Sequence, residues 1–345
     1  MKLYSYFLPQ FYPTPENDKF WGKDFTDWVS TRNGKPLFDG HKQPYRPLVH
    51  GEYDLSEKPQ AKKVIDYSVR IGIDGLIYWH YWFSNGFQTL EKVPEIHLSE
   101  KKINQKFCFA WANADWTKSW QGDNNTIIFK QIYSESSAIE HFNYLKSFFS
   151  DSRYIKFNGN FLFQVNHGTS NEVKMHMKIL DDLCFNEFGS RIHFLLPKDK
   201  LSIDLSDFNH SLISFPPGEI YSSLLSYKVQ RFFQEIGILN KPVRISQNSY
   251  VNNFKKFTNQ NPDIIPCILS GWDNTARYKN KGVVLLGNIK ELIRRQIDVI
   301  KSTRKVHEII LVKAFNEWAE GNIIEPHEFD GDIIYPYESL EELKK

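Results

Sequence analysis

The chain has 345 residues and a formal net charge of +2, from 43 basic and 41 acidic residues. This near-neutral balance gives no sign of the basic surface that nucleic-acid binding requires, so no nucleic-acid partner is expected. No window approaches the roughly 18 consecutive apolar residues of a membrane-spanning helix, so no membrane span is expected. The length fits one (β/α)8 barrel of about 250 residues with insertions, or two smaller domains.

The amino terminus and the cysteines favour a cytoplasmic protein. The first apolar run breaks at Pro9 and Gln10, too early for the core of a signal peptide. Cys108, Cys184 and Cys267 have no short spacing typical of a zinc site and are expected to be buried free thiols. Aromatic residues make up 15% of the chain, which fits both a packed core and a cleft that stacks on sugars.

Short apolar runs alternate with amphipathic stretches along the chain. A first strand is predicted over 3–8, followed by a loop over 9–58 whose length indicates a functional role. A helix is predicted over 60–71, where Gly72 ends it. Strands follow at 74–82, 107–111, 160–165, 193–197, 212–215, 264–270 and 308–314, and helices at 137–149, 173–188, 286–300 and from 340.

This order of elements predicts an α/β fold. Strands that alternate with helices are typical of a parallel sheet with helical crossovers. Roughly eight strands, together with the length, favour a single (β/α)8 TIM-type barrel with long βα loops, as one domain spanning 1–345. An open doubly wound sheet is the alternative. The segment 219–261 gives no clear pattern.

Polar and aromatic side chains gather where several predicted strands end. All strands of a (β/α)8 barrel open on one face, and that face holds the active site. Aromatic, amide and acidic side chains on one rim suit a polyhydroxylated ligand, so an oligosaccharide or polysaccharide partner is expected. The side chains predicted to contact it are Tyr12, His80, Tyr81, Trp82, Trp111, Asn113, Asp115, Trp116, Trp272, Asp273, Arg277, Asn316 and Trp318.

Structural roles remain open for several of these residues. Asp273 and Arg277 either bind sugar hydroxyls and orient a carboxylate, or form an ion pair that braces the rim. Trp116 and Trp272 serve either as stacking platforms or as caps on the core. His80 is either a ligand contact or a histidine with its hydrogen bonds satisfied at the rim.

Glu317 and Glu320 are the predicted catalytic pair. Glycosyl transfer needs one carboxyl group that protonates the leaving oxygen and a second, ionised one. Residues three apart point to opposite sides of a strand but become neighbours on a helical turn, so a turn must begin after residue 314. Gly321 and Asn322 are compatible with such a turn. Two surface glutamates are the alternative.

Other chemistries have weaker support. The chain has neither a Gly-x-Ser-x-Gly motif nor a phosphate loop. Asp330-Gly331-Asp332 matches the Asp-x-Asp of metal-dependent transferases, but an acidic segment with a central glycine is more typical of a turn. No spacing supports a metal, so no metal site and no cofactor are predicted.

Motifs that resemble a known family lie in order along the whole chain. They are Phe7-Leu8-Pro9-Gln10-Phe11-Tyr12, Pro15-Glu16-Asn17-Asp18, Phe20-Trp21-Gly22, Gly40-His41-Lys42-Gln43-Pro44, Tyr53-Asp54-Leu55, Gly72-Ile73-Asp74-Gly75, Tyr81-Trp82-Phe83, Trp111-Ala112-Asn113, Gly271-Trp272-Asp273-Asn274-Thr275 and Asn316-Glu317-Trp318-Ala319-Glu320-Gly321. Together they resemble the WbsX-like family, catalogued with bacterial surface-polysaccharide and O-antigen biosynthesis, often as glycosyltransferases. They are also similar to glycoside hydrolase family 99, the retaining endo-α-mannosidases on a (β/α)8 barrel.

The hydrolase resemblance implies a mechanism. It makes Glu317 the base that activates the substrate 2-hydroxyl, which attacks the anomeric carbon and gives a 1,2-anhydro sugar. It makes Glu320 the general acid and then the base, with no metal or nucleotide. The chain departs from the pattern at Ala114, where many relatives carry an acid that Asp115 replaces, and at Ala319, where the hydrolases tend to carry His. The identity of the sugar therefore stays open.

Three functions compete. The first is a retaining, endo-acting glycosidase or transglycosidase, and the second is a nucleotide-sugar-dependent glycosyltransferase of polysaccharide biosynthesis. The third is a non-catalytic glycan-binding barrel, which the carboxylate pair disfavours. A cytoplasmic setting fits biosynthesis better than degradation, and the sequence leaves this tension unresolved.

Overall fold

Eight parallel strands form the centre of the molecule. The computed structural model describes residues 1–83, 86–118, 126–303, 305–329 and 331–344. Within these residues the strands run in the order β11–β10–β9–β5–β3–β1–β15–β13. They are β1 (Lys2–Phe7), β3 (Gly75–Trp82), β5 (Phe107–Trp111), β9 (Asn160–Val165), β10 (Ile192–Pro197), β11 (Asn209–Ile213), β13 (Cys267–Leu269) and β15 (Ile309–Lys313).

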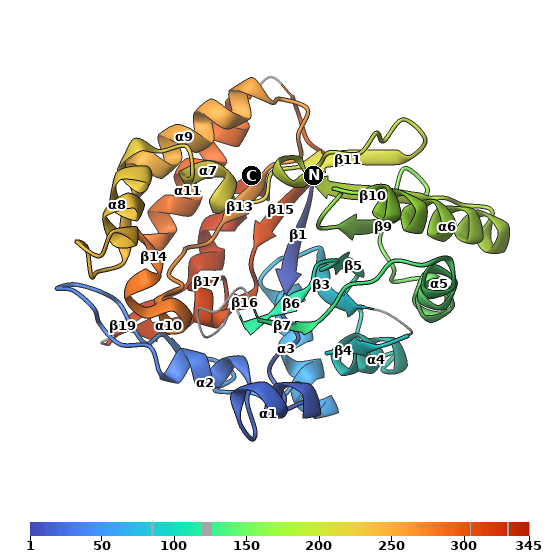
Figure 1. The fold of residues 1–345 in the computed structure, drawn as a ribbon, viewed down its shortest axis with the longest axis horizontal. Helices are drawn as coiled ribbons and strands as arrows, with labels where there is room; N and C mark the ends of the chain where they lie inside the picture. Colours follow the sequence, from blue (N-terminus) through green and yellow to red (C-terminus); the bar gives the residue numbers. More distant parts are fainter. Residues whose placement is uncertain (84–85, 119–125, 304, 330, 345) are drawn as a thin grey trace.

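A short bridge joins the two ends of this strand order. Ile213, at the end of β11, pairs in parallel with Ile265, just before β13. The Ser214 amide donates to the Ile265 carbonyl at 3.0 Å, and the Ile265 amide donates to the Leu212 carbonyl at 2.9 Å. The sheet thus closes on itself, and the predicted α/β barrel is confirmed (Figure 1).

Helices surround the barrel because each turns an apolar stripe towards the strands. In α3 the buried residues recur at helical spacing, from Ala61 through Val64 and Ile65 to Ser68. The surrounding helices are α3 (Lys58–Arg70), α4 (Lys92–Ser99), α5 (Glu135–Phe149), α6 (Asn171–Phe188), α9 (Gln247–Gln260) and α11 (Ile289–Lys301), with the 3-10 helix Pro336–Lys344 at the carboxyl end. No helix among the described residues is both long and apolar enough to cross a bilayer.

The loops carry shorter elements. The long first loop contains α1 (Pro15–Trp21), α2 (Asp27–Arg32) and β2 (Arg46–Pro47). The segment between β11 and β13, unreadable in the sequence, contains α7 (Gly218–Tyr221), α8 (Leu225–Glu235) and β12 (Val243–Ser246) before α9. The other short elements are β4 (Gln88–Thr89), β6 (Trp116–Thr117), β7 (Ile127–Phe129), β8 (Lys156–Phe157), α10 (Thr275–Tyr278), β14 (Val283–Leu286), β16 (Asn316–Glu317), β17 (Asn322–Ile323), β18 (His327–Phe329) and β19 (Asp332–Ile334).

Several predicted element boundaries need correction. The strand predicted over 212–215 is β11, which begins at Asn209 and ends at Ile213, and the strand predicted over 264–270 is limited to β13. The helix predicted over 286–300 begins only at Ile289, because Gly287 has φ 142° and Asn288 caps the helix by accepting the Glu291 amide. Leu286 instead ends the strand β14. The helix predicted from 340 is a 3-10 helix that already begins at Pro336. Of the Asp330-Gly331-Asp332 motif, Asp330 lies outside the described residues.

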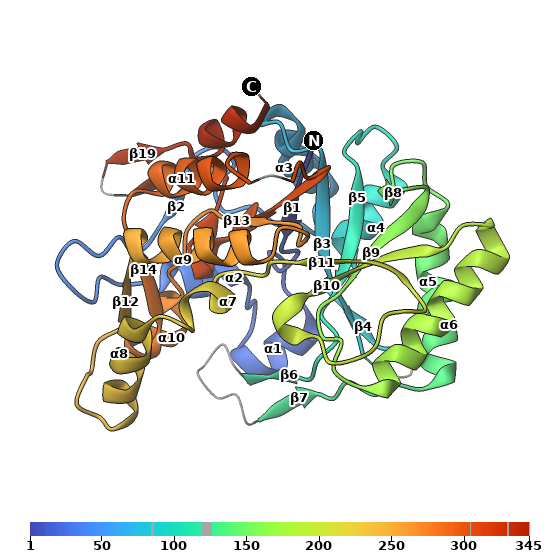
Figure 2. The same cartoon turned by 90° about the horizontal axis from the view of Figure 1, so that it is seen from above.

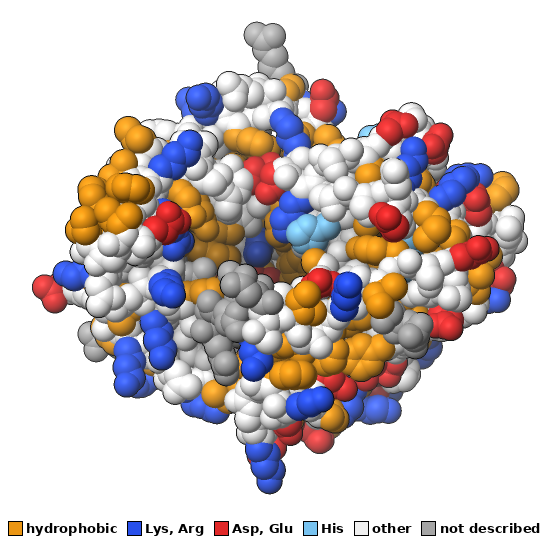
Figure 3. Space-filling model, in the orientation of Figure 1, with side chains coloured by type: hydrophobic (Ala, Val, Ile, Leu, Met, Phe, Trp, Pro, Cys, Tyr) orange, Lys and Arg blue, Asp and Glu red, His pale blue; other side chains and the backbone are white. Residues whose placement is uncertain are grey.

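One end of the barrel is open. The turn from β3 into β4 and the β6–β7 hairpin mark the carboxyl ends of the strands, at the bottom of Figure 2, whereas the amino terminus lies at the top. Figure 3 looks onto this mouth and shows a hollow near the centre, with charged side chains and a histidine at its rim. The three cysteines are buried, free thiols.

Candidate active site

Glu317 and Glu320 lie on a tight turn that follows β15. Glu317 ends the short strand β16, and Trp318–Glu320 form one turn of 3-10 helix. Gly321 then takes the left-handed conformation, with φ 64°, which a glycine adopts without strain. The turn lets residues three apart share one environment, and each carboxyl group shifts the pKa of the other.

The Glu317 carboxyl group is buried at the mouth of the barrel. Its Oε1 accepts the Trp79 indole N–H at 2.8 Å, and its Oε2 lies 3.5 Å from the Lys313 ammonium. Burial raises the pKa of Glu317, Lys313 lowers it, and repulsion from Glu320 raises it again, so the net shift is upward. Glu317 is therefore the member of the pair that takes up a proton more readily.

The Glu320 carboxylate is held by a buried arginine. Arg277 donates to Glu320 at 2.6 Å and, through its other terminal nitrogen, to Asp27 at 2.7 Å. The Asn322 amide lies 3.4 Å from the second Glu320 oxygen. Burial alone would raise the pKa of Glu320, but Arg277 and then Lys313 lower it by more. The net shift is downward, so Glu320 is the member of the pair that releases its proton more readily.

The long first loop reaches this pair through Asp27. This residue opens α2 and is fully buried. One of its oxygens binds Arg277, and the other accepts the Ala319 backbone amide at 3.2 Å, between the two glutamates. Asp27 thus connects the long first loop to the site, in line with the functional role expected for this loop. No motif in the sequence had pointed to Asp27.

Aromatic rings line the interior beneath Glu317. Trp79 stacks on Tyr6 with 5.4 Å between ring centroids, and Phe215 packs edge-on against both. The Lys313 ammonium lies 4.8 Å from the centre of the Phe215 ring. Burial lowers the pKa of Lys313, but Glu317 and Glu320 raise it by more, so the amine remains charged. Below Glu317 the interior of the barrel therefore holds both packed aromatic rings and a buried cation.

Tyr81 and Trp116 form a second aromatic wall. Their rings stack with a centroid distance of 5.3 Å, and both line a small cavity together with Asp115. Both glutamates raise the pKa of the Tyr81 hydroxyl, after burial itself, which places this ring near the pair. Asp115 is exposed and accepts the Gln131 amide at 2.7 Å. These three predicted residues lie beside the mouth.

Three other predicted contacts lie on the outer side of the barrel. His80, Trp82 and Trp111 face α5 and α6, because alternate residues of a strand point to opposite faces. His80 shares a hydrogen bond of 2.8 Å with His141, which contacts His176 at 3.1 Å. Trp82 stacks on His141 at 4.8 Å, and Trp111 donates to the Trp82 carbonyl at 2.9 Å. The structure does not bring these residues to the glutamates.

Asn316 and Trp318 flank Glu317 but point into the protein. The Asn316 side chain accepts the Leu8 amide at 2.7 Å and donates to the Leu8 carbonyl at 3.0 Å. Trp318 donates to Glu325 at 3.0 Å, and Glu325 also accepts the Tyr53 hydroxyl at 2.7 Å. Burial raises the pKa of Glu325 to about 8. Both residues fix the turn that carries Glu317.

Asp273 does not form the ion pair with Arg277 that the sequence left open. One Asp273 oxygen contacts His41 and Gln43, each at 2.8 Å, and the other accepts the Thr275 hydroxyl at 2.6 Å. These bonds tie the first loop to the end of β13 and occupy both oxygens of the carboxylate. Arg277 instead pairs with Glu320 and Asp27, a contact that fits both the predicted orienting role and a bracing role.

Two further predicted residues make hydrogen bonds that support the structure around the site. The Tyr12 ring is buried, and its hydroxyl accepts the Lys92 amide at 3.2 Å. Asn113 donates to the His167 carbonyl and accepts the His167 amide, both at 2.8 Å, which joins the loops after β5 and β9. Trp79 and Lys313, which contact Glu317, and Asp27, which binds Arg277, were not predicted as site residues. Trp79 shares its strand face with Tyr81, which is the one signal that points to it.

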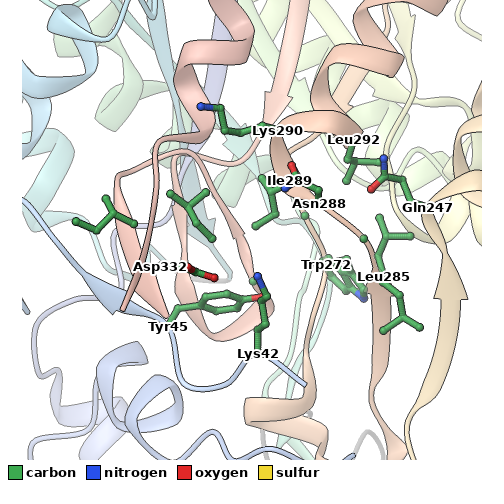
Figure 4. Close-up of a pocket in the computed structure, with 16 residues that line it drawn as sticks. Lys42, Tyr45, Gln247, Trp272, Leu285, Asn288, Ile289, Lys290, Leu292 and Asp332 are labelled. Carbon is green, nitrogen blue, oxygen red and sulfur yellow. The ribbon is translucent and has the colours of Figure 1, made fainter. Parts of the chain in front are cut away.

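Two cavities flank the pair. A cavity of about 940 Å³ lies beside Arg277, between the first loop and α10, and its lining includes Trp21, Phe25, Lys35, Lys279 and Lys281. A smaller one of about 220 Å³ lies behind Trp272, whose ring is also 5.4 Å from the Lys313 ammonium (Figure 4). Within the described residues, no group of three His, Cys, Asp or Glu side chains could hold a metal ion.

Known proteins resemble this chain over most of its length. Residues 3–334 match the model of the family described as Glycosyltransferase WbsX. The chain belongs to this family. Two relatives from Xanthomonas campestris pv. campestris, both called uncharacterized protein WxcX, are 25% identical over 337 residues. That match covers 94% of this chain but only 47% of each relative, so the chain spans about half their length.

Solved structures share the fold of this WbsX family member. One described as a glycoside hydrolase-like protein has a TM-score of 0.57 and 13% identity, over 99% of this chain and 92% of its own. The GH99 endo-alpha-mannosidase from Bacteroides thetaiotaomicron has a TM-score of 0.54 and 13% identity, over 97% and 91%. Membership of the WbsX family is confirmed and supports a carbohydrate-active enzyme, whereas the likeness to the GH99 structure is a likeness of fold.

Proposed function

We propose that this protein cleaves or transfers glycosyl units within a bacterial polysaccharide, with Glu317 and Glu320 as the catalytic pair. The observation that carries the proposal is the opposite electrostatic setting of two adjacent carboxyl groups at the barrel mouth. Neighbouring groups whose pKa values are pushed apart are the usual basis for separate acid and base roles. The aromatic surfaces beside the pair support a sugar as the ligand.

The resemblance to family 99 gives the roles that we adopt for the pair. Glu317 would take the proton of the substrate 2-hydroxyl, since its raised pKa makes it the stronger base of the two. This role requires the ionised form of Glu317, which the nearby Lys313 ammonium favours. Glu320 would protonate the leaving oxygen. Arg277 lowers the pKa of Glu320 in the empty cleft, so this role requires the pKa to rise when substrate enters.

A leaving-group experiment tests these roles. An aryl glycoside with an acidic phenol needs little protonation as it leaves. If Glu320 is the acid, Glu320→Gln should release the phenol of such a substrate at nearly the wild-type rate in the first turnover, and should lose this step on a natural glycan. Glu317→Gln should be inactive on both. The reverse pattern would exchange the two roles, and full activity of either variant on both substrates would remove that residue from the mechanism.

A nucleotide-sugar-dependent transferase is the second candidate. Lys35, Lys279 and Lys281 line the larger cavity beside Arg277, and cations at such a place suit a diphosphate. Incubating the protein with defined glycans, with and without nucleotide sugars, separates the candidates when products are followed by mass spectrometry. Cleavage or transfer without nucleotide supports the first candidate. Strict dependence on a nucleotide sugar supports the second, and binding without any product supports a glycan-binding barrel.

A further inference from the structure

Helix α8 is attached to the protein by its polar side. Gln230 donates to the Arg244 carbonyl at 2.9 Å and accepts the Arg244 amide at 2.9 Å. Gln234 donates to the carbonyls of Lys241 and Asn280, and Arg231 donates to the Lys281 carbonyl at 3.0 Å. An amphipathic helix on a globular protein normally packs its apolar stripe inward. In α8 this orientation is reversed.

The apolar side of α8 consequently faces outward. The exposed side chains are spaced as one helix face, and Ile238 extends the face just beyond the helix. They are Leu225 at 75% exposure, Val229 at 44%, Phe232 at 56%, Phe233 at 39%, Ile236 at 50% and Ile238 at 71%. Figure 3 shows them as a cluster of hydrophobic side chains at the left edge. Contiguous exposed apolar surface of this kind marks an interaction site.

Exposed lysines lie on α8 and on the segments that hold it. Lys228 on α8 is exposed, and so are Lys241, Lys279 and Lys281 on the segments to which α8 is hydrogen-bonded. The helix carries a single acidic residue, Glu235. An apolar stripe with a cationic margin is the pattern of helices that lie in the surface of an anionic bilayer. A second copy of the chain would bring the same positive charge to the contact, which disfavours a symmetric dimer here.

We propose that the apolar face of α8 docks on the surface of an anionic lipid bilayer. The aromatic and aliphatic side chains would enter the boundary between headgroups and acyl chains, while the four lysines meet the lipid phosphates. None of the described helices crosses the bilayer in this arrangement. The docking itself does not depend on the proposed glycosyl chemistry.

Docking would place the cleft beside the membrane. In Figure 2, α8 lies at the lower left, on the same side of the molecule as the β6–β7 hairpin and the barrel mouth. The larger cavity shares Asn280 and Lys281 with the segment that binds α8, and its wall continues to Arg277 and hence to Glu320. If the proposed function holds, the site is positioned to receive a glycan carried on a lipid.

Vesicle sedimentation tests the docking. The wild-type protein is expected to bind vesicles of phosphatidylcholine with 30% phosphatidylglycerol, and to bind pure phosphatidylcholine much less. Changing Phe232→Glu with Ile236→Glu should lower the bound fraction at least tenfold, because it places charge in the apolar face. Lys228→Gln with Lys241→Gln should weaken binding and reduce its dependence on salt. Ile139→Glu is the matched control, since Ile139 is 40% exposed on α5, away from α8.

Specific results would overturn the proposal. Wild-type protein that does not bind the anionic vesicles, or a double glutamate variant that binds them as well as wild type, would do so. A dimer that sedimentation velocity detects in wild type, and that the double variant abolishes, would assign the face to a second copy instead. Turnover of a soluble glycan by the double variant should equal that of wild type, so loss of docking is distinguishable from failure of the proposed chemistry.

Discussion

The two faces of β3 carry the same kinds of side chain and do different things. Trp79 and Tyr81 point into the barrel, where one binds Glu317 and the other stacks on Trp116. His80 and Trp82 point outward and pack beneath α5. The presence of aromatic side chains therefore does not by itself identify a sugar-binding site. The side of the strand decides which rings meet the carboxyl pair and which belong to the frame.

The strongest test of the inner face removes a carboxyl charge. Glu317→Gln and Glu320→Gln should each lower turnover of the natural substrate by about 10³-fold, within the range of general acid–base catalysis. The side chains stay nearly the same size, so circular dichroism and melting temperature should change little. Turnover within tenfold of wild type would contradict the assignment of that residue.

Removing the arginine between the two carboxylates should affect both activity and stability. Arg277→Gln leaves the buried Asp27 without its charge partner, which costs about 3–5 kcal/mol of unfolding free energy. Turnover should fall about 100-fold, because Glu320 is no longer oriented. Arg32→Gln is the control: it removes an exposed ion pair with Glu52 on the same helix as Asp27. Urea denaturation should show a change below about 1 kcal/mol for this variant.

A matched pair of tryptophan variants compares the two faces of β3 directly. Each change to phenylalanine removes one indole hydrogen bond, from Trp79 to Glu317 at 2.8 Å or from Trp82 to Ser137 at 3.2 Å. A bond to a charged group contributes about 1.5–3 kcal/mol, so Trp79→Phe should lower kcat/KM by tenfold or more. Trp82→Phe should leave kcat/KM unchanged. Equal losses would show that the inner position has no special role.

The last comparison concerns the outer face and the dependence of stability on pH. Burial lowers the pKa of His80 and of His176 to about 3, and that of His141 in the same direction. Below about pH 6.5 the unfolded chain binds protons that the folded chain does not, so stability falls as the pH falls. Each histidine contributes about 1.4 kcal/mol per pH unit between these limits. Urea denaturation from pH 7 to 4.5 should show the slope, and His176→Gln should reduce it.

Much of the fold was predictable because the barrel strands are short apolar runs between polar segments. The predicted bounds of β5 and β9 match the structure, and those of β1 and β15 differ by one residue at either end. The segment 219–261 was left unassigned, although the apolar residues of α8 recur at helical spacing. The spacing alone does not show that this side of the helix faces outward.

The candidate site was predictable in part. The glutamate turn and the barrel mouth follow from spacing and position. The run from Tyr78 to Trp82 gave no clue to which alternate residues face inward, because both faces are aromatic. Asp27 and Lys313 were not predicted, because their roles depend on contacts with Arg277 and Glu317 that form only in the closed barrel.

The barrel closes on a narrow seam. Between β11 and β13 the described backbone is joined around a single residue, Ile265, whereas neighbouring strands elsewhere pair over three or more residues. The segment that contains α8 follows β11 on one side of this seam and leads into β13 on the other. Local opening of the seam would loosen that segment while the other strand pairs stay intact. The amide hydrogen of Ser214 should therefore be among the first in the barrel to exchange with solvent.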